Sequence, residues 1–535
     1  MRRAFEALTK EIFDLIIIGG GIVGTGIARD AALRGIHTLL VEKEDFAYGT
    51  TSSSSRLIHG GLRYLRTLQL KLIRQDLKER EILLNIAPHL VHRLKFVIPL
   101  LRSEPLYRLT LPLALRMYDI LTKGKSLPSS RCLSRQETIE IEPCLSEING
   151  LVGSYLYYDC QSEFMERLCL ENALSAAENG ACILNHTTMT DLLIRDNTVY
   201  GIQVKDAFSG KSYLANGRVI INAGGPWADL VLDKLNANKK YSLRKTKGIH
   251  LFTSKISDNA LVLFAKSDGR LFFVIPWKNY SLIGTTDTDY VSDLDTVHAD
   301  APSVDYLVSE MRHYFPKFTQ DDIYYTIAGL RPLVATGGKT ASNTSRAHKL
   351  VDHEREDGIK GFITVLGGKI TAYRAIAEAA SDLVCKKLAL DAPCRTAYTP
   401  LPGAPDVKTQ TIKQAAQKNS LSLETIAHLT AIYGSRFSSV LDYVRADKRL
   451  GQPISHGNRD ILAQIKHAVE QEEALTVSDF LLRRSFLGLE PSLGIDTVET
   501  VAREMGLLLG WSNTEQQNQI ESYHASAALG HCFTQ

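Results

Sequence analysis

The chain has 535 residues, of which 44% are hydrophobic and 23% are charged, and its formal net charge is +3. This length excludes a single ordinary core and predicts two or three domains. The composition excludes a largely disordered protein, and the small net charge gives no reason to expect nucleic acid as a partner.

The eight cysteines are scattered without a C-x-x-C pair, so neither a zinc nor an iron–sulfur site nor any other metal is predicted. A reduced, cytoplasmic setting fits this distribution better than a disulfide framework. The first residues are basic, but glycines interrupt the apolar run that follows, so no secretory signal is predicted. No stretch approaches the ~18–20 apolar residues that span a bilayer, and any membrane contact is therefore expected to be peripheral.

The chain opens with a strand, a glycine turn, a helix and a second strand. The strand at 15–18 leads into Gly19-x-Gly21-x-x-Gly24, and the helix that follows ends at Gly35. Such a turn brings the backbone close to a pyrophosphate, which the helix N-terminus then attracts. Glu42, at the end of the second strand, can accept hydrogen bonds from a ribose and would repel a ribose phosphate, which disfavours NADP. We therefore predict a dinucleotide site.

The elements beyond this unit follow from periodicity and turn residues. In chain order, the pattern predicts a serine-rich loop (50–55), an amphipathic helix (65–87), an irregular basic and leucine-rich stretch (89–150), a helix (166–179), short strands (181–222 and 243–290) and a strand–loop–helix segment (320–375). A proline-rich linker, TPLPGAP at 399–405, precedes a C-terminal part that is almost wholly helical in pattern.

Two further glycine loops lie far downstream of the first. They read NAGGPW at 222–227 and LGGKIT at 366–371, and each follows an apolar strand and precedes a helical pattern. Glycines let the backbone lie close to a flat ring, and a helix N-terminus stabilises the negative charge of a reduced flavin. A site built from such distant segments favours FAD over NAD.

These motifs together resemble one family. IIIGGGIVGTGIARDAALRG, TSSSSRLIHGGLRYL, INAGGPWA, LIGTTDTDY, IAGLRPL and LGGKITAYR resemble, in order and spacing, FAD-dependent glycerol-3-phosphate dehydrogenase of the aerobic type. That family belongs to the glycine oxidase/D-amino-acid oxidase-like flavoproteins. The anaerobic relatives carry cysteine-rich tails for an iron–sulfur centre, whereas this tail holds only Cys532.

The resemblance and the pattern together predict an α/β fold with three parts. We expect a Rossmann-type FAD-binding domain from discontinuous segments (1–90, 151–228 and 325–395), an antiparallel-sheet substrate domain (91–150 and 229–324) and a C-terminal helical domain (399–535). The predicted cofactor-binding residues are Gly19, Gly21, Gly24, Glu42, Thr51, Ser52, Ser55, His59, Gly224, Gly225, Pro226, Trp227, Gly367, Gly368, Lys369, Ile370 and Thr371.

The implied substrate is glycerol 3-phosphate, a dianion with a secondary alcohol that several cations would bind. By resemblance, the active-site residues are Arg63, Tyr64, His250, Arg331, Arg346 and Lys369. A base must take the hydroxyl proton while a hydride leaves C2, and His250 is our first choice because its pKa ordinarily lies near neutrality. Arg63, Arg331 and Lys369 would assist catalysis by charge, although the sequence does not separate base from clamp.

The segment 93–131 holds eight basic and two acidic residues with interleaved leucines, the composition of an interfacial segment on anionic lipid. Interior packing with a solvated basic face is the alternative. The resemblance favours a peripheral enzyme on the inner face of the cell membrane that passes electrons to quinone. We also expect a homo-oligomer, a dimer.

Three other functions stay open at this stage. They are a glycerol-3-phosphate oxidase that reduces oxygen, an amine or amino-acid oxidase of the same fold, and a non-catalytic FAD-binding regulator. The cluster of cations argues against the amine oxidase, because an amino acid needs one carboxylate clamp rather than a phosphate cage.

Overall fold

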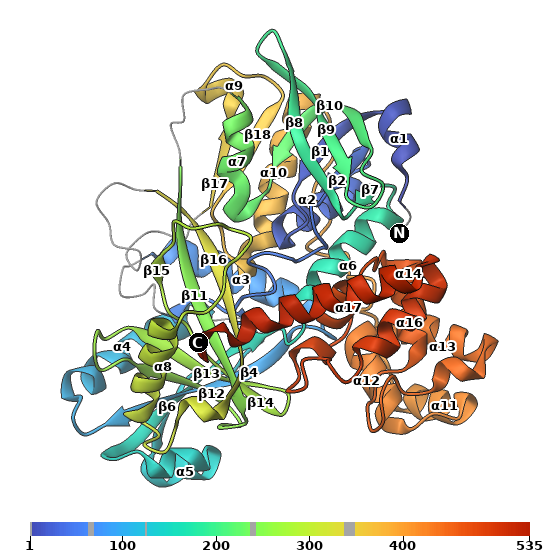
Figure 1. The fold of residues 1–535 in the computed structure, drawn as a ribbon. Helices are drawn as coiled ribbons and strands as arrows, with labels where there is room; N and C mark the ends of the chain where they lie inside the picture. Colours follow the sequence, from blue (N-terminus) through green and yellow to red (C-terminus); the bar gives the residue numbers. More distant parts are fainter. Residues whose placement is uncertain (1–2, 63–68, 123–125, 236–241, 336–347, 535) are drawn as a thin grey trace.

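The structure is a computed structural model that describes residues 3–62, 69–122, 126–235, 242–335 and 348–534. Two sheets form separate layers of the molecule, and a helical C-terminal part runs along both (Figure 1). The predicted fold class, an α/β protein with a C-terminal helical domain, is confirmed.

The first sheet is mostly parallel and has the strand order β17-β18-β10-β1-β2-β7, with β8 and β9 added as an antiparallel extension of β10. Its strands are β1 (Ile12–Ile18), β2 (Thr38–Val41), β7 (Cys182–Leu184), β8 (Thr187–Arg195), β9 (Thr198–Asp206), β10 (Ser212–Asn222), β17 (Lys349–Asp352) and β18 (Phe362–Leu366). The central strands are buried on both faces, which explains their continuous apolar runs.

Helices cover this first sheet and complete its core. They are α1 (Phe5–Lys10), α2 (Ile22–Leu33), α6 (Met165–Glu178), α7 (Ala228–Leu232) and α10 (Tyr373–Leu388), with the short α9 (His353–Glu356) beside β18. The helix α2 packs between α6 and α10, and small side chains allow the close approach: Ala28, Ala31 and Ala377 are all buried in one apolar cluster. The glycine turn is thereby held by three helices.

The second sheet is largely antiparallel, in the order β15-β11-β14-β13-β12-β4-β6-β3, with β16 paired to β11 and β5 to β6. Its strands are β3 (Leu57–Ile58), β4 (His92–Leu101), β5 (Arg131–Ser134), β6 (Leu151–Gln161), β11 (Leu243–Ser254), β12 (Ala260–Phe264), β13 (Leu271–Trp277), β14 (Tyr280–Gly284), β15 (Thr288–Asp289) and β16 (Ile323–Val334). The helices around it are α3 (Leu70–Ile86), α4 (Pro105–Thr122), α5 (Arg135–Ile141) and α8 (Ala301–Arg312).

The structure corrects the expectation that residues 89–150 are irregular. They form β4, α4, β5 and α5, and β4 lies inside the second sheet between β6 and β12. Its Leu100 and Leu101 are buried, so this part of the proposed lipid-binding segment is interior packing. The sequence pattern did not indicate this strand, because β4 is basic at one end and apolar at the other and so lacks the alternation of polar and apolar residues that identifies a strand.

Three strands that the sequence analysis placed in the FAD-binding domain pair in the second sheet instead, namely β3, β6 and most of β16. Periodicity identifies a strand but not its partner, because pairing depends on distant residues. We therefore propose that residues 57–58, 151–161 and 323–334 belong with the substrate domain.

The C-terminal part consists of α11 (Thr409–Asn419), α12 (Leu423–Tyr433), α13 (Phe437–Ala446), α14 (Leu462–Glu472), α15 (Val477–Arg483), α16 (Val498–Leu509) and α17 (Asn513–Ala528). The long α17 returns toward the second sheet, where the chain ends (Figure 1). There Thr326 of β16 donates a hydrogen bond to the carbonyl of Gly530 at 2.7 Å. The end of the chain thus packs on a strand of the second sheet.

A buried ion network fixes the C-terminal part to the first sheet. Asp45, which follows β2, accepts hydrogen bonds from Arg483 and Arg484 at 2.7–3.0 Å. His186 lies 2.9 Å from Asp479, an ion pair that raises the pKa of His186 against the effect of burial. Asp45, His186 and Asp479 could together hold a metal ion, but the arginines already neutralise both carboxylates.

Candidate active site

The glycine turn after β1 is packed so tightly that two of its glycines cannot carry a side chain. A Cβ on Gly24 would lie 1.9 Å from the carbonyl oxygen of Gly19, and one on Gly19 would lie 2.7 Å from that of Ala223. A Cβ on Gly21 would meet only the Thr51 hydroxyl at 3.5 Å, which is ordinary contact. Gly19 and Gly24 therefore serve packing, whereas Gly21 leaves the backbone open toward the cavity beside it.

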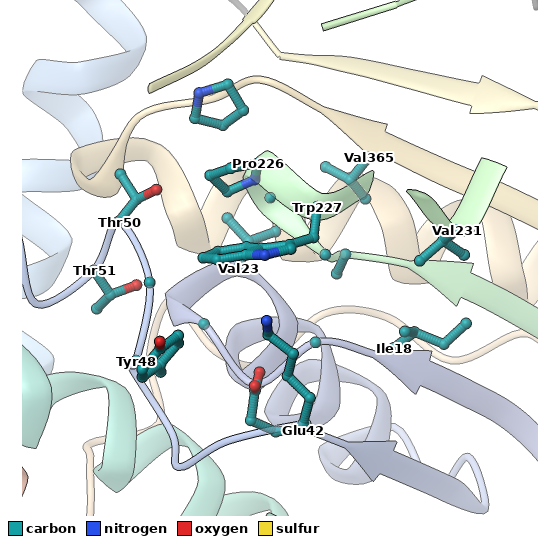
Figure 2. Close-up of a pocket in the computed structure, with 18 of the residues that line it drawn as sticks. Ile18, Val23, Glu42, Tyr48, Thr50, Thr51, Pro226, Trp227, Val231 and Val365 are labelled. Atoms are coloured by element: carbon teal, nitrogen blue, oxygen red, sulfur yellow. The ribbon is translucent and has the colours of Figure 1, made fainter. Parts of the chain in front are cut away.

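That cavity has a volume of about 330 Å³, in the range of small-molecule sites, and lies at the carboxyl ends of β1, β2, β10 and β18 (Figure 2). The predicted residues that line it are Gly19, Gly21, Glu42, Thr51, Gly224, Gly225, Pro226, Trp227, Gly367, Gly368, Lys369 and Ile370. All three glycine loops thus meet at one place, as a site for one extended cofactor requires.

The side chains around the cavity are held by local hydrogen bonds. Glu42 accepts from the backbone N–H groups of Gly20 at 2.5 Å and Glu44 at 2.9 Å, and burial raises the pKa of its carboxyl group. The Thr51 hydroxyl accepts from the N–H of Ile22, the first residue of α2, at 3.1 Å. The glycines, this helix N-terminus and the buried acid fit the pyrophosphate and ribose of FAD.

Two residues that the sequence analysis missed complete the wall opposite the glycines. Lys43 lies over the Trp227 ring, with its Nζ 4.6 Å from the ring centroid. Tyr48 packs against the same ring, with 6.2 Å between the ring centroids (Figure 2). The Trp227 Nε1–H also donates to Asp295 at 3.0 Å. Of Lys43 and Tyr48, only Lys43 could have been suggested by the sequence, through its position next to Glu42.

A second group of predicted residues lies on the second sheet. Arg331 of β16 is paired with Thr246 of β11, and its guanidinium crosses the neighbouring Gly248, where a Cβ would lie 2.1 Å away. Arg331 donates to Thr285 at 2.7 Å and to Asp287 at 3.2 Å. The absence of a side chain at Gly248 therefore makes room for the guanidinium of Arg331.

His250 lies on the same face of β11 as Gly248 and is 2% exposed. Its Nε2 is 2.8 Å from the hydroxyl of Ser55, while its Nδ1 has no hydrogen-bond partner among the described residues. Burial lowers the pKa of His250 to about 3, and the positive charges of Arg331 and Arg56 act in the same direction. The imidazole is therefore neutral, but it is a much weaker base in the free protein than the ordinary histidine that the sequence analysis assumed.

The loop that joins β18 to α10 brings Lys369 toward the cavity. Gly367 and Gly368 have φ values of +69° and +115°, which glycine adopts without strain. Lys369 forms an ion pair with Asp76 of α3, and the Thr371 hydroxyl accepts from the N–H of His59 at 3.2 Å. This loop is therefore tied to the segment that follows the serine-rich loop.

The remaining predicted residues have different positions. Ser52, Ser55, His59 and Thr371 are not among the residues that line the cavity, and the Ser52 hydroxyl donates to the carbonyls of Tyr48 and Gly49 in its own turn. Arg63, Tyr64 and Arg346 lie outside the described residues, so their roles stay predictions. Asp76 and Asp287, which hold Lys369 and Arg331, were not predicted. Asp76 is a single acid in a helix and has no distinguishing pattern, whereas Asp287 lies in the LIGTTDTDY motif, which could have suggested it.

Known proteins match the chain over nearly its whole length. The profile "FAD dependent oxidoreductase" matches residues 14–374, and the "C-terminal domain of alpha-glycerophosphate oxidase" matches residues 394–516. A glycerol-3-phosphate dehydrogenase of Synechocystis sp. is 38% identical, covering 98% of this chain and 97% of its own. The aerobic glycerol-3-phosphate dehydrogenase of Staphylococcus haemolyticus is 33% identical, covering 95% and 93%.

A solved structure agrees with these sequence matches. The glycerol-3-phosphate dehydrogenase from Bacillus halodurans, complexed with FAD, superposes with a TM-score of 0.81 at 28% identity and covers 98% of this chain and 97% of its own. A glycine oxidase from Bacillus cereus shares the fold over 70% of this chain and 95% of its own, with a TM-score of 0.54 at 19% identity. The resemblance seen in the motifs is confirmed: the chain belongs to the FAD-dependent oxidoreductases and, among them, to the glycerol-3-phosphate dehydrogenase family.

Proposed function

We propose that this protein oxidises glycerol 3-phosphate to dihydroxyacetone phosphate with FAD and passes the electrons to a membrane quinone. The observation that carries the proposal is the match to a relative named glycerol-3-phosphate dehydrogenase, which is 38% identical and aligns along 98% of the chain. The cavity at the three glycine loops supports the cofactor, since its backbone and its buried acid suit a dinucleotide.

The residues of the site suit an anionic alcohol. Lys369 lines the cavity and pairs with Asp76, and Arg331 pairs with Asp287 and precedes Pro332, which lines the cavity. Such charges can bind a phosphate and stabilise the oxygen of the alcohol as its proton leaves. FAD, when bound, supplies the acceptor for the hydride that departs from C2.

His250 is the proposed base for the hydroxyl proton. Its neutral imidazole is fixed by Ser55, and its Nδ1 is free of other bonds among the described residues. A pKa near 3 makes it a weak base in the free protein, chiefly because it is buried and next because of Arg331. The dianionic substrate would offset the arginine charge and so raise the basicity of His250 where the proton must be taken.

The test is anaerobic bleaching of the flavin in the purified protein. Glycerol 3-phosphate should remove the absorbance near 450 nm, whereas glycerol, which lacks the phosphate, and glycine, a substrate for an amine oxidase, should not. Bleaching by glycine alone would replace the proposal with an amine oxidase, and no bleaching by any of the three would indicate a non-catalytic protein.

An oxidase that passes electrons to oxygen is the second candidate, because the C-terminal part matches the corresponding domain of alpha-glycerophosphate oxidase. Oxygen uptake with one peroxide per substrate would favour it. Reduction of a short-chain quinone in anaerobic solution, at a rate well above the rate with oxygen in air, would favour the dehydrogenase.

We further propose that α4 binds the membrane surface that holds the quinone. Its apolar residues Leu106, Leu109, Leu113 and Ile120 are 65–76% exposed and recur at helical spacing, while Leu111, Leu115 and Tyr118 on the opposite side are buried. Arg102, Arg108 and Arg116 are exposed along the same segment, and α4 lies at an outer edge of the molecule (Figure 1). Exposed leucines with flanking arginines suit an anionic lipid surface. Among the described residues, no helix has the length and apolarity needed to cross a membrane.

A triple change of Leu106, Leu109 and Leu113 to serine should reduce binding to vesicles of phosphatidylglycerol and phosphatidylcholine, with dye-linked activity retained. Leu507→Ser is the matched control, since Leu507 is 72% exposed on α16, away from α4. The idea fails if the triple variant sediments with vesicles as fully as the control. High salt should release only part of the wild-type protein from the vesicles, because the leucines contribute binding free energy that salt does not screen.

A further inference from the structure

The helix α3 directs three consecutive charges of one face into the interior. Asp76, Glu79 and Arg80 are all at most 1% exposed, which is rare for ionised residues. Glu79 binds Arg374 of α10 through both oxygens, at 2.6 and 2.7 Å. Arg80 donates to Asp159 of β6 at 2.7 Å. These two pairs tie α3 to α10 and to β6 within about one helical turn of Asp76.

Among the described residues, the carboxyl group of Asp76 pairs with Lys369, which lines the cavity. Its Oδ2 is paired with the ammonium of Lys369, whereas its Oδ1 has no hydrogen-bond partner among the described residues. The two residues are 293 positions apart in the chain. A buried carboxylate with half of its acceptor capacity unused costs stability, so packing alone does not explain this acid.

We propose that Asp76 is a positioning residue for the oxidation: it holds the Lys369 ammonium at the cavity and sets how much positive charge the flavin feels. The proposal rests on the role proposed above for Lys369. An ammonium beside a flavin favours the reduced, anionic form, and a carboxylate in contact with that ammonium cancels part of its effect. The pair would therefore tune the tendency of the flavin to accept a hydride.

The surroundings of Asp76 make this balance sensitive to pH. Burial raises the pKa of Asp76 to about 6, Lys369 opposes that rise, and the negative charges of Asp159 and Glu79 add to it. Above this pH the carboxylate is ionised and neutralises Lys369. Below it Asp76 is protonated, Lys369 keeps its charge, and the flavin should become a stronger electron acceptor.

The experiment measures the midpoint potential of the bound flavin by equilibration with a reference dye from pH 5 to pH 8. Asp76→Asn should shift the two-electron equilibrium at pH 7.5 by about tenfold toward reduced flavin, which is about 30 mV. The difference from wild type should close below pH 6. Glu81→Gln is the control, because Glu81 lies on the same helix but binds Arg80 and Ser126 near the surface.

Each outcome separates this inference from the proposed function. If Lys369→Met leaves the potential unchanged, the lysine is not at the flavin and its assignment fails. If Lys369→Met lowers the potential but Asp76→Asn does not raise it, Asp76 has no such role. Should Asp76→Asn not fold, the wild-type protein decides: a plot of potential against pH without a change of slope near pH 6 overturns the inference.

Discussion

Alanine substitutions at Gly21 and Gly24, only three residues apart, should affect different properties. The change at Gly24 should lower the stability of the fold, and the change at Gly21 should lower the affinity for FAD. At Gly24 the new methyl group would lie 1.9 Å from the Gly19 carbonyl oxygen, so α2 would have to move by more than 1 Å. Because α2 is packed against α6 and α10, overpacking of about 3 kcal/mol or more is expected. In a chain of 535 residues, each kcal/mol lowers Tm by roughly 1 °C, so a loss of about 3 °C or more is expected.

At Gly21 the methyl group meets no protein atom closer than 3.5 Å, so the fold should be unaffected. It would instead occupy the space where the backbone approaches the cofactor and displace one pyrophosphate contact. Such a contact is worth about 1.5–3 kcal/mol, or tenfold to a few hundredfold in FAD affinity.

The assay compares thermal unfolding of the deflavinated proteins with FAD titrations followed by flavin fluorescence. Gly24→Ala should lose several degrees in Tm without FAD present. Gly21→Ala should keep the wild-type Tm and bind FAD more weakly. If Gly21→Ala binds FAD as wild type does, the cofactor is not at this turn, and an unchanged Tm for Gly24→Ala would refute the packing argument.

Three further predictions concern other parts of the site. Arg331→Ala should keep its flavin but lose tenfold to a few hundredfold in kcat/KM, about 1.5–3 kcal/mol; wild-type turnover would remove Arg331 from the site. The pKa of His250 is depressed in the folded state, so its contribution to stability is present above pH 6.5 and lost as pH falls toward 3. The Tm advantage of wild type over His250→Gln should accordingly shrink on acidification; a constant difference would show that the imidazole is not held neutral. Asp45→Asn should leave the charges of Arg483 and Arg484 uncompensated, at a cost of about 3–5 kcal/mol, visible as earlier proteolysis of the C-terminal helices; unchanged resistance would mean that the network is dispensable.

The sequence was sufficient for the elements whose geometry is local. The turn from Gly19 to Gly24 has its own strand and helix on either side, and the loop at Gly367 and Gly368 likewise follows a strand, so both could be recognised from neighbouring residues. Most helices and strands from residue 165 onward follow the predicted pattern, but the helix α8 lies between 291 and 319, where no element was predicted.

What escaped prediction depends on contacts between distant segments. Asp76 is significant only because Lys369, far along the chain, meets it, and the apolar strand β4 reveals its burial only through its neighbours in the sheet. The segment 93–131, which was predicted to bind lipid, shows the same limit: composition could not separate the buried Leu101 from the exposed Leu109. In each of these cases, contacts with distant segments rather than local propensity determine whether the residue is buried and what it binds.

The parallel sheet has a consequence for how the protein is made. Its central strands β18, β10 and β1 lie side by side but come from residues 362–366, 212–222 and 12–18. During synthesis β1 can pair with β2 early, but its other neighbour, β10, begins only at residue 212, and such non-local pairing is slow to form. The cavity proposed to hold FAD is lined by Gly367 and Gly368, so it is incomplete until more than two thirds of the chain has left the ribosome. We therefore expect FAD to bind late in biogenesis and to stabilise the assembled fold rather than to start its folding.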